Sequence, residues 1–335
     1  MTDSPTRTPI SAAAQDLLAR FDAGEPLALA RAITRVENEA PGFEAMLHAL
    51  HERLGRARRI GMTGPPGAGK STLTAGLARH YRDAGDTVGV VAVDPSSPFT
   101  GGALLGDRIR MDDLATETGI FIRSMASRGS HGGLSATTRE ATDLMDAFGF
   151  DRILLETVGV GQSELEIASQ ADTTVVVLVP ESGDGIQAMK AGLMEVADIF
   201  VVNKADRPGA DRLAKEIRVV DGLRRKRTTA AEREAGLATW EPPILKTVAT
   251  TGEGIVELAE ALDGHLEHLA ATGLLERRRR AAALEHTRLV LERTVSRRAA
   301  SEWAKELAAT GDGDLFRDGE SPYEIARRIA ARVNP

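Results

Sequence analysis

Short apolar runs alternate with amphipathic stretches through the middle of the chain, from about residue 59 to residue 271. Several of these runs are continuously apolar, which is typical of strands that helices cover on both faces. We therefore predict seven strands, at residues 59–63, 87–94, 119–123, 152–156, 173–179, 199–203 and 244–247. Strands that alternate with helices in this way indicate an α/β fold with a doubly wound, mostly parallel sheet.

Helical periodicity replaces the strand pattern at both ends of the chain. Residues 1–58 are predicted to form an N-terminal extension of about three short helices, and Pro26 and Pro41 stand where helices can begin. Residues 272–335 are predicted to form a helical C-terminal arm that closes with a short helix over 321–333. A narrow apolar seam follows one face of this arm at Leu284, Leu291 and Val295. Such a seam suits an interaction surface, and equally a helix packed on its own domain.

The composition is that of an ordinary globular protein, since 42% of the residues are hydrophobic and 27% are charged. The formal net charge of −7 argues against a general affinity for nucleic acid or anionic membrane, because such binding depends on a basic surface. The chain has no cysteine, which excludes disulfides and thiolate metal ligands. No apolar run is long enough to cross a bilayer or to form a signal peptide, so we expect a cytoplasmic protein.

Residues 64–71 read GPPGAGKS and fit the phosphate-binding pattern GxxxxGK[ST]. The segment follows an apolar strand and opens a helix, which is the context that the motif requires. Backbone N–H groups in such a loop converge on the β-phosphate, and the helix N-terminus favours negative charge. We expect Lys70 to bridge the β- and γ-phosphates and Ser71 to offer its hydroxyl to Mg²⁺. The expected phosphate-binding residues are Gly64, Pro65, Pro66, Gly67, Ala68, Gly69, Lys70, Ser71 and Thr72.

A second motif, NKAD, ends the predicted strand at 199–203 and consists of Asn203, Lys204, Ala205 and Asp206. A carboxylate at this edge of the sheet can accept from both N1–H and the 2-amino group of guanine, which adenine does not supply. We expect Asp206 to be buried, so that ATP would leave its carboxylate unpaired. Together the two motifs predict GTP rather than ATP, with Asn203, Lys204 and Asp206 at the base. Thr250, after the last strand, is expected to help close over the base.

Carboxylates end two further predicted strands, at Asp94 and Glu156. Parallel strands end at one edge of a sheet, so both should face the crevice that holds Ser71 and suit Mg²⁺ or its bound waters. A helix cap or an ion pair with a nearby arginine is the alternative for either residue. Gly159 is suited to approach the γ-phosphate with its backbone N–H, which makes residues 157–162 a predicted switch between GTP and GDP.

Longer segments resemble one known family, the bacterial MeaB/ArgK GTPases, which are relatives of the human methylmalonic aciduria type A protein. DPSSP at 94–98 with GGALLGDRIRM at 101–111 looks like the first switch of that family. ETVGVGQSE at 156–164 is similar to its second switch, and GDGIQAMK at 183–190 resembles the additional switch that addresses its partner. The resemblance covers nearly the whole chain, and it implies a P-loop NTPase domain of the SIMIBI type at residues 59–271.

The resemblance also implies a function. It points to a G-protein chaperone of adenosylcobalamin-dependent methylmalonyl-CoA mutase, which gates cofactor loading and protects the mutase while slow GTP hydrolysis times the cycle. By matching position, Asp94 and Asp107 become magnesium or catalytic candidates, and Gln187 and Lys190 become the partner-sensing residues. The C-terminal arm becomes a dimerisation arm of a homodimer. One departure is that residues 180–182, PES, open the third switch with an acid where the family commonly has small residues.

The expected catalytic residues are therefore Lys70, Asp94, Asp107, Arg108 and Glu156, and the expected magnesium ligands are Ser71, Asp94, Asp107 and Glu156. Arg108 lies in a Gly-rich segment, where an arginine can neutralise transition-state charge. A solvated loop charge is an equal alternative for Arg108. His131, in another Gly-rich segment, is better interpreted as a surface histidine than as a residue that positions water.

Three rival functions share parts of this pattern. A nickel-insertion GTPase would need a Cys and His cluster, whereas His265 and His268 stand at i,i+3 without partners. A kinase that serves amino-acid transport would need ATP, which the NKAD motif disfavours. The non-enzymatic alternative is a GTP-dependent binding scaffold in which hydrolysis is incidental.

Overall fold

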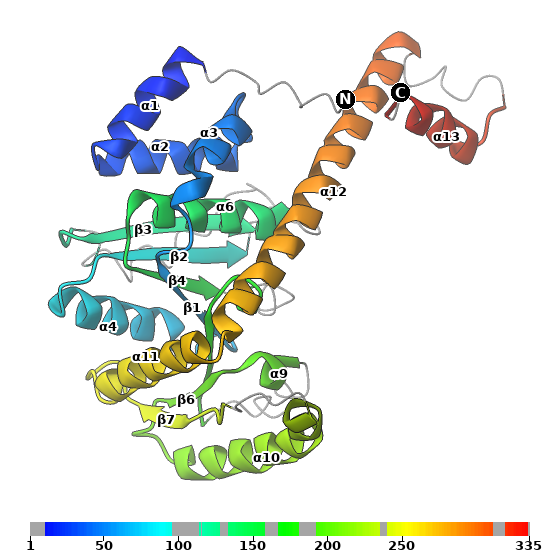
Figure 1. The fold of residues 1–335 in the computed structure, drawn as a ribbon. Helices are drawn as coiled ribbons and strands as arrows, with labels where there is room; N and C mark the ends of the chain where they lie inside the picture. Colours follow the sequence, from blue (N-terminus) through cyan, green and yellow to red (C-terminus); the bar gives the residue numbers. More distant parts are fainter. Residues whose placement is uncertain are drawn as a thin grey trace.

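A computed structural model describes residues 11–95, 114, 116–127, 133–157, 167–180, 192–234, 240–310 and 319–333 (Figure 1). Within these ranges a seven-stranded sheet has the order β3-β2-β4-β1-β5-β6-β7, and every strand pair is parallel. The strands are β1 (Arg58–Thr63), β2 (Val88–Pro95), β3 (Ile120–Ser127), β4 (Arg152–Thr157), β5 (Thr173–Leu178), β6 (Ile199–Asn203) and β7 (Ile244–Thr247). The predicted doubly wound α/β fold and its seven strands are confirmed.

The bounds of β3 differ most from the prediction. This strand was expected to end at Arg123, where its apolar run stops, but it continues to Ser127. The reason is its parallel register with β2, which runs on as far as Pro95 paired with Ser127. Backbone hydrogen bonding to a neighbouring strand extends β3 beyond the point that its side chains indicate.

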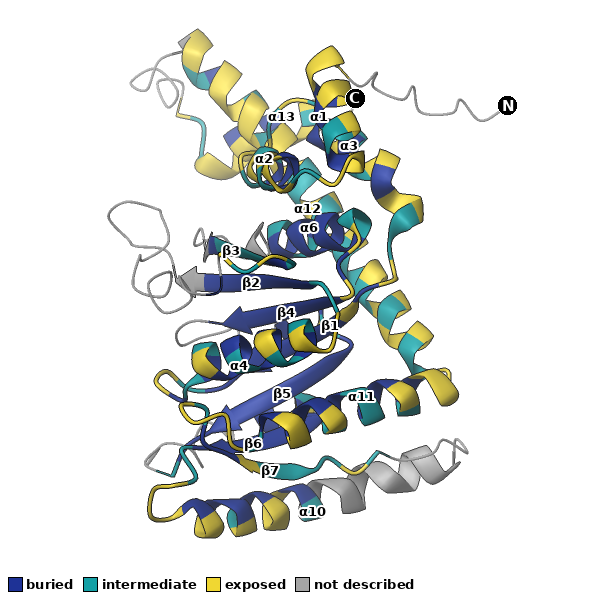
Figure 2. Ribbon diagram, turned by 90° about the vertical axis from the view of Figure 1, so that its left-hand side faces the viewer, coloured by how far each residue is buried: buried dark blue, intermediate teal, exposed yellow. Residues whose placement is uncertain are grey.

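Helices cover both faces of the sheet (Figure 2). They are α4 (Lys70–Asp83) and α11 (Ile255–Ala271) on one face, and α6 (Gly133–Phe148), the short α9 (Met194–Val196) and α10 (Ala210–Glu234) on the other. Alternate residues of β5 show the division. Val175 and Val177 join the core beneath α4 and α11, whereas Val176 and Leu178 join the core beneath α10. All four are fully buried, which explains why this strand is continuously apolar.

The N-terminal extension consists of α1 (Ala12–Asp22), α2 (Pro26–Glu37), α3 (Phe43–Leu50) and the 3₁₀ turn η1 (His51–Arg53). The predicted three short helices are therefore present, and Pro26 occupies the first turn of α2. These helices share one apolar core with α6, in which Leu29 and Ile33 of α2 and Leu144 of α6 are fully buried. The extension is thus packed onto one layer of the α/β domain.

The C-terminal arm is the 37-residue helix α12 (Leu274–Thr310), which runs along the domain and then beyond it to α13 (Pro322–Val333) (Figure 1). Its predicted seam is exposed: the exposed fractions of Leu284, Leu291 and Val295 are 68%, 61% and 48%. These side chains are therefore not packed on their own domain in the structure. Within the described ranges no helix is long and apolar enough to cross a membrane.

Two adjacent arginines fix the start of α12 to the sheet. Arg278 donates to both carboxylate oxygens of Asp198, at 2.7 Å each, and Arg279 donates to both oxygens of Asp172, at 2.8 and 2.7 Å. Asp172 and Asp198 immediately precede β5 and β6, so both pairs lie at the amino edge of the sheet. Bidentate pairs of this kind fix orientation as well as position, which sets the direction in which the arm leaves the domain.

A buried histidine adjoins this anchor. His265 of α11 is 0% exposed, its Nδ1 lies 2.8 Å from the hydroxyl of Thr173, and its Nε2 lies 3.4 Å from a carboxylate oxygen of Asp198. Burial lowers the pKa of His265 to about 4, and the cation of Arg278 adds to this against the opposing effect of Asp198. His265 is therefore neutral near pH 7, and its approach to Asp198 is not an ion pair. The ring of Trp240 packs against His265 and against His268 of the same helix.

The free energy of unfolding should depend on pH because of His265. The unfolded chain binds this proton near pH 6.5 and the folded protein only near pH 4, so stability is complete above pH 6.5 and falls as the pH drops through that window. The loss should be on the order of 3 kcal/mol. Urea unfolding at a series of pH values, for the wild type and for His265→Gln, measures it. An identical pH dependence between pH 6.5 and 4 in both proteins would show that His265 is not responsible.

Candidate nucleotide site

The phosphate-binding segment connects β1 to α4 at the carboxyl edge of the sheet, the side toward which all arrowheads point in Figure 2. β1 lies between β4 and β5, and the strands that follow in sequence are placed on either side of it. Such a reversal of strand order opens a crevice at the carboxyl ends of parallel strands, where ligands of this fold class bind.

Glycine is required in this loop because the backbone conformation and the available space both exclude a side chain. Gly64, Gly67 and Gly69 have φ angles of 137°, 73° and 87°, which L-residues rarely adopt. A β-carbon on Gly64 would collide with the backbone carbonyl of Val177 in β5, and one on Gly69 would collide with the side chain of Asn203. The loop therefore lies directly against the ends of β5 and β6.

Lys70 is the first residue of α4, and its side chain folds back over the loop. Its ammonium group donates to the carbonyl oxygens of Gly64, at 2.6 Å, and Pro65, at 3.1 Å, and the residue is only 5% exposed. Carbonyl oxygens thus hold a buried cation on the inner side of the loop, beside the first turn of a helix. This arrangement suits an anion such as a phosphate chain.

Two of the expected magnesium ligands are brought together. The hydroxyl of Ser71, in the first turn of α4, donates a short hydrogen bond to the carboxylate of Glu156, which is 1% exposed near the end of β4. A hydroxyl and a carboxylate are the hard oxygen ligands that Mg²⁺ prefers, so these residues fit that cation. Asp94 is the next-to-last residue of β2, beside β4 at the same edge, but its side chain lies outside the described part of the structure.

The side chain of Asn203 connects three parts of the site. Its amide nitrogen donates to the carbonyl of Ala68 in the phosphate-binding loop at 2.8 Å. Its oxygen accepts from the hydroxyl of Thr247 and from the backbone N–H of Ala249, each at 3.1 Å. The residue is 2% exposed, so one buried amide ties the phosphate loop to β7 and to the loop after it.

The sequence did not predict this tie, because Asn203 was assigned to the base alone. Ala68 and Asn203 are 135 residues apart, and no local pattern relates them. The NKAD motif marks Asn203 as a site residue but does not indicate that its side chain reaches the phosphate loop. In the structure Asn203 is buried, whereas Asp206 is exposed.

The other residues of the guanine-reading motif are more open. Lys204 has a left-handed φ of 56°, which turns the chain sharply after β6. Asp206 is exposed, so the expectation that its carboxylate is buried is wrong for the protein without nucleotide. Thr250 is also exposed, in the turn after β7, and the backbone N–H of Ala205 donates to the carbonyl of Thr247 at 3.0 Å. The two loops are thus held together with their polar side chains free to face a ligand.

Several predicted site residues lie outside the described part of the structure. They are Asp107, Arg108, His131, Gly159, Gln187 and Lys190. Within the described ranges there is no group of three or more His, Asp or Glu side chains that could hold a metal ion by itself. His265 and His268 accordingly form no such cluster, since His265 is bonded to Thr173 in the core.

Comparison with known proteins identifies the type of site. The family model described as methylmalonyl Co-A mutase-associated GTPase MeaB matches residues 29–304. A Pyrococcus horikoshii protein that carries the provisional name of a GTPase is 44% identical over 321 residues, covering 95% of this chain and 98% of that protein. GTPase ArgK of Escherichia coli (strain K12) is 38% identical over 284 residues, covering 82% of this chain and 83% of that protein. The crystal structure of an LAO/AO transport system kinase is similar with a TM-score of 0.64 and 29% identity, over 98% of this chain and 100% of that one.

Replacing Asn203 should weaken nucleotide binding through the phosphate loop. Asn203→Ala removes three hydrogen bonds, so we expect an affinity for GTP that is lower by about tenfold or more and a stability lower by about 1–3 kcal/mol. Asn203→Asp keeps the acceptor for Thr247 and Ala249 but loses the donor to Ala68, and should lose affinity too. Asn38→Ala, at an exposed residue of the N-terminal extension, is the matched control. Calorimetric titration with GTP measures the affinity of all three variants. An Asn203→Ala variant that binds GTP with the wild-type affinity would contradict the proposed link between Asn203 and the phosphate loop.

Proposed function

The chain belongs to the family of methylmalonyl-CoA mutase-associated GTPases, and on this premise we propose that it is the G-protein chaperone of an adenosylcobalamin-dependent methylmalonyl-CoA mutase. In this role it gates the loading of the cofactor and protects the mutase, and GTP hydrolysis times each cycle. The observation that carries the proposal is the position of the phosphate loop between the two strands that precede the segments proposed as the second and third switches.

These strands are β4 and β5, the two neighbours of β1 in the sheet. The sequence of the second switch follows β4, and that of the third switch follows β5. Both therefore start at strand ends that flank the phosphate loop. A change from GTP to GDP at the loop is thus next to the origins of both segments, and Gly159, Gln187 and Lys190 are proposed to transmit it.

Within the site each residue has a proposed task. Lys70 stabilises charge on the β- and γ-phosphates, and the backbone N–H groups of residues 67–72, which follow the two prolines of the loop, hold the phosphate chain. Ser71 and Glu156 would hold Mg²⁺, which supplies charge neutralisation at the phosphates when it is bound. Glu156 meanwhile orients the hydroxyl of Ser71 by hydrogen bonding. Asp94, Asp107 and Arg108 are proposed as further magnesium or catalytic groups from the first switch.

The base is proposed to lie between the NKAD loop and the turn that holds Thr250. Asp206 is exposed and can accept from both guanine donors, while adenine would leave it without them. This choice of nucleotide separates the proposed function from that of a kinase that uses ATP, although the crystal structure named LAO/AO transport system kinase is similar in fold. A nickel-insertion role is disfavoured because the chain has no cysteine and because the described residues hold no group of three or more His, Asp or Glu side chains that could bind the metal.

We also propose that the protein is a homodimer through its arm. The exposed seam of Leu284, Leu291 and Val295 supports this, because these residues repeat at intervals of seven and four along one helix. A second copy would remove this apolar surface from water. A scaffold role without catalysis would use the same seam, and only turnover measurements separate the two.

The mutase should accelerate GTP turnover, and Lys190 should be needed for that acceleration. GTP turnover of the purified protein is measured with and without methylmalonyl-CoA mutase from the same source, for the wild type, Lys190→Ala and Lys215→Ala, an exposed lysine on α10. We expect stimulation of the wild type and of Lys215→Ala, with slow basal turnover in all three. Lys190→Ala should keep its basal turnover and lose the stimulation.

Two results would count against this account. Stimulation of Lys190→Ala to the wild-type level would remove Lys190 from partner sensing. GTP turnover that no cobalamin-dependent mutase stimulates would leave the GTPase assignment intact and exclude the chaperone role.

A further inference from the structure

A small cavity lies at the amino edge of the sheet, opposite the nucleotide site. Its volume is about 210 Å³, and its lining comes from the end of the N-terminal extension, β1, α6, the residues before β5 and the start of α12. Four arginines line it, namely Arg59, Arg139, Arg278 and Arg279, together with the carboxylate of Asp172. An arginine-rich cavity where five segments of the chain meet is unusual for a purely structural void, because empty cavities are normally apolar.

Two of these arginines use their hydrogen-bond donors to fix the start of α12 to the sheet. Arg278 is bound to Asp198, and Arg279 is bound to Asp172 and to the carbonyl oxygens of Gly55 and Ala57. The Asp172 carboxylate also accepts the backbone N–H of Arg59 at 3.0 Å, so both its oxygens have donors. The arginine donors and the carboxylate oxygens on this side of the cavity therefore have hydrogen-bond partners within the protein.

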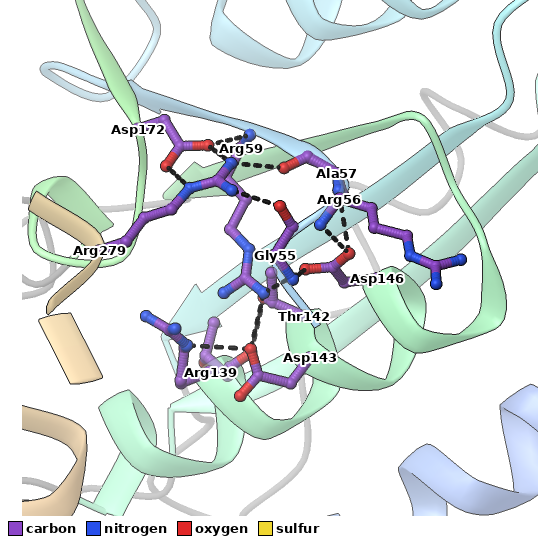
Figure 3. A network of polar contacts seen from close by, with 11 residues as sticks. Gly55, Arg56, Ala57, Arg59, Arg139, Thr142, Asp143, Asp146, Asp172 and Arg279 are labelled. Atoms are coloured by element: carbon purple, nitrogen blue, oxygen red, sulfur yellow. Dashed lines mark hydrogen bonds and ion pairs between the residues drawn. The ribbon is translucent and has the colours of Figure 1, made fainter. Parts of the chain in front are cut away.

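Arg59 and Arg139 are different, because both have donors left over. The side chain of Arg59 is 6% exposed, and its Nη2 donates to Asp143 at 2.7 Å and to Asp146 at 2.8 Å. Its Nη1 is buried and has no hydrogen-bond partner among the residues that the structure describes. Figure 3 shows this end of the guanidinium turned away from both carboxylates, toward the side on which Arg139 lies.

Arg139 approaches the same carboxylate from α6. Its Nε donates to Asp143 at 3.0 Å, and its side chain is 14% exposed. Its two terminal nitrogens make no hydrogen bond within the described ranges. Burial lowers the pKa of Arg139, Asp143 opposes this, and the nearby cation of Arg59 lowers the pKa further. Two guanidinium groups thus share one carboxylate in a poorly solvated place.

The remaining carboxylate of the network is already neutralised in part by the backbone. Asp146 accepts the N–H groups of Gly55, Arg56 and Ala57 at 2.8, 3.1 and 2.9 Å, besides its contact with Arg59 (Figure 3). Hydrogen bonds from backbone N–H groups stabilise a carboxylate as a cation does. The formal charges of the network balance, but backbone N–H groups take part in stabilising Asp146, so Nη1 of Arg59 and the terminal nitrogens of Arg139 are left without a carboxylate partner among the described residues.

We propose that this cavity binds a small oxyanion of the phosphate class between the free donors of Arg59 and Arg139. A tetrahedral oxyanion suits the site because donors reach it from a strand and from a helix, and planar guanidinium groups bind such oxygens well. The volume selects a small occupant, since sites for drug-sized ligands measure roughly 300–1,000 Å³. The bound anion would join α6 to β1 beside the anchor of the arm, and it would stabilise the folded protein.

A saturation experiment with inorganic phosphate tests the site. The full chain is first saturated with Mg²⁺ and a non-hydrolysable GTP analogue, so that the phosphate loop is filled and cannot bind the probe. The melting temperature is then measured against phosphate concentration at constant ionic strength, with chloride as the balancing anion. A site that binds only the folded protein raises the melting temperature in a saturable manner.

Two variants locate the effect. Arg139→Gln removes the charge that faces the cavity and should weaken phosphate binding by about tenfold or more. Arg280→Gln removes an exposed arginine from the same region of α12 and should respond like the wild type. A response that does not saturate, that chloride reproduces, or that Arg139→Gln retains in full would overturn the proposal and leave ordered water as the occupant.

A second pair of variants keeps the test decisive if Arg139→Gln does not fold. Ala282 of α12 lines the cavity, and Ala282→Glu would place a tethered carboxylate there, whereas Ala282→Gln has the same size without the charge. We expect Ala282→Glu to melt at a higher temperature than Ala282→Gln and to lose the phosphate response. Equal melting temperatures for the two variants would contradict an anion site.

Discussion

The phosphate loop lies so close to the ends of β5 and β6 that no side chain fits between them, and the rest of the site depends on this close approach. Gly64 is pressed against the backbone of Val177, and Gly69 against the side chain of Asn203. Because the loop is this close, the Asn203 amide reaches the carbonyl of Ala68 and holds the phosphate and base regions at one fixed separation. A nucleotide must bridge that separation, so the spacing of β1 and β6 in the sheet sets the distance between the two halves of the site.

The two edges of the sheet have opposite chemistry. At the carboxyl edge, the loops that follow the strands carry the protein groups proposed to bind the nucleotide, which are mostly backbone N–H groups, hydroxyls and single charged side chains. At the amino edge, arginines and aspartates form a dense network that fixes α6, the N-terminal extension and the arm to the strands. Asp172 and Asp198 precede β5 and β6, while residues that follow β5 belong to the proposed third switch. β5 therefore leads to the proposed third switch at its carboxyl end, whereas Asp172, which binds Arg279 of the arm, precedes its amino end.

The sequence was sufficient for features that are local. The short apolar runs, which alternate with amphipathic stretches, located all seven strands, and GPPGAGKS located the loop, because their causes lie within a few residues. It was insufficient where contacts join distant segments: the extension of β3 depends on the register with β2, and the role of Asn203 depends on Ala68. Asp206 was expected to be buried because it follows a buried strand, whereas the structure places it in an exposed turn after Lys204. The network around Arg59 gave no sequence signal, because its members come from the start of β1, from α6, from Asp172 and from α12, which are far apart in the sequence.

Nucleotide preference in Asp206→Asn tests the central claim, that this is a guanine-specific site, most directly. Affinities for GTP, ATP and xanthosine triphosphate are measured by titration for the wild type and the variant. An aspartate matches the two donors of guanine, whereas an asparagine matches the N1–H donor and 2-carbonyl acceptor of xanthine. We therefore predict strong preference for GTP in the wild type, and in the variant a loss of GTP affinity with a gain for xanthosine triphosphate. Equal binding of ATP and GTP by the wild type, or unchanged preference in the variant, would contradict the account.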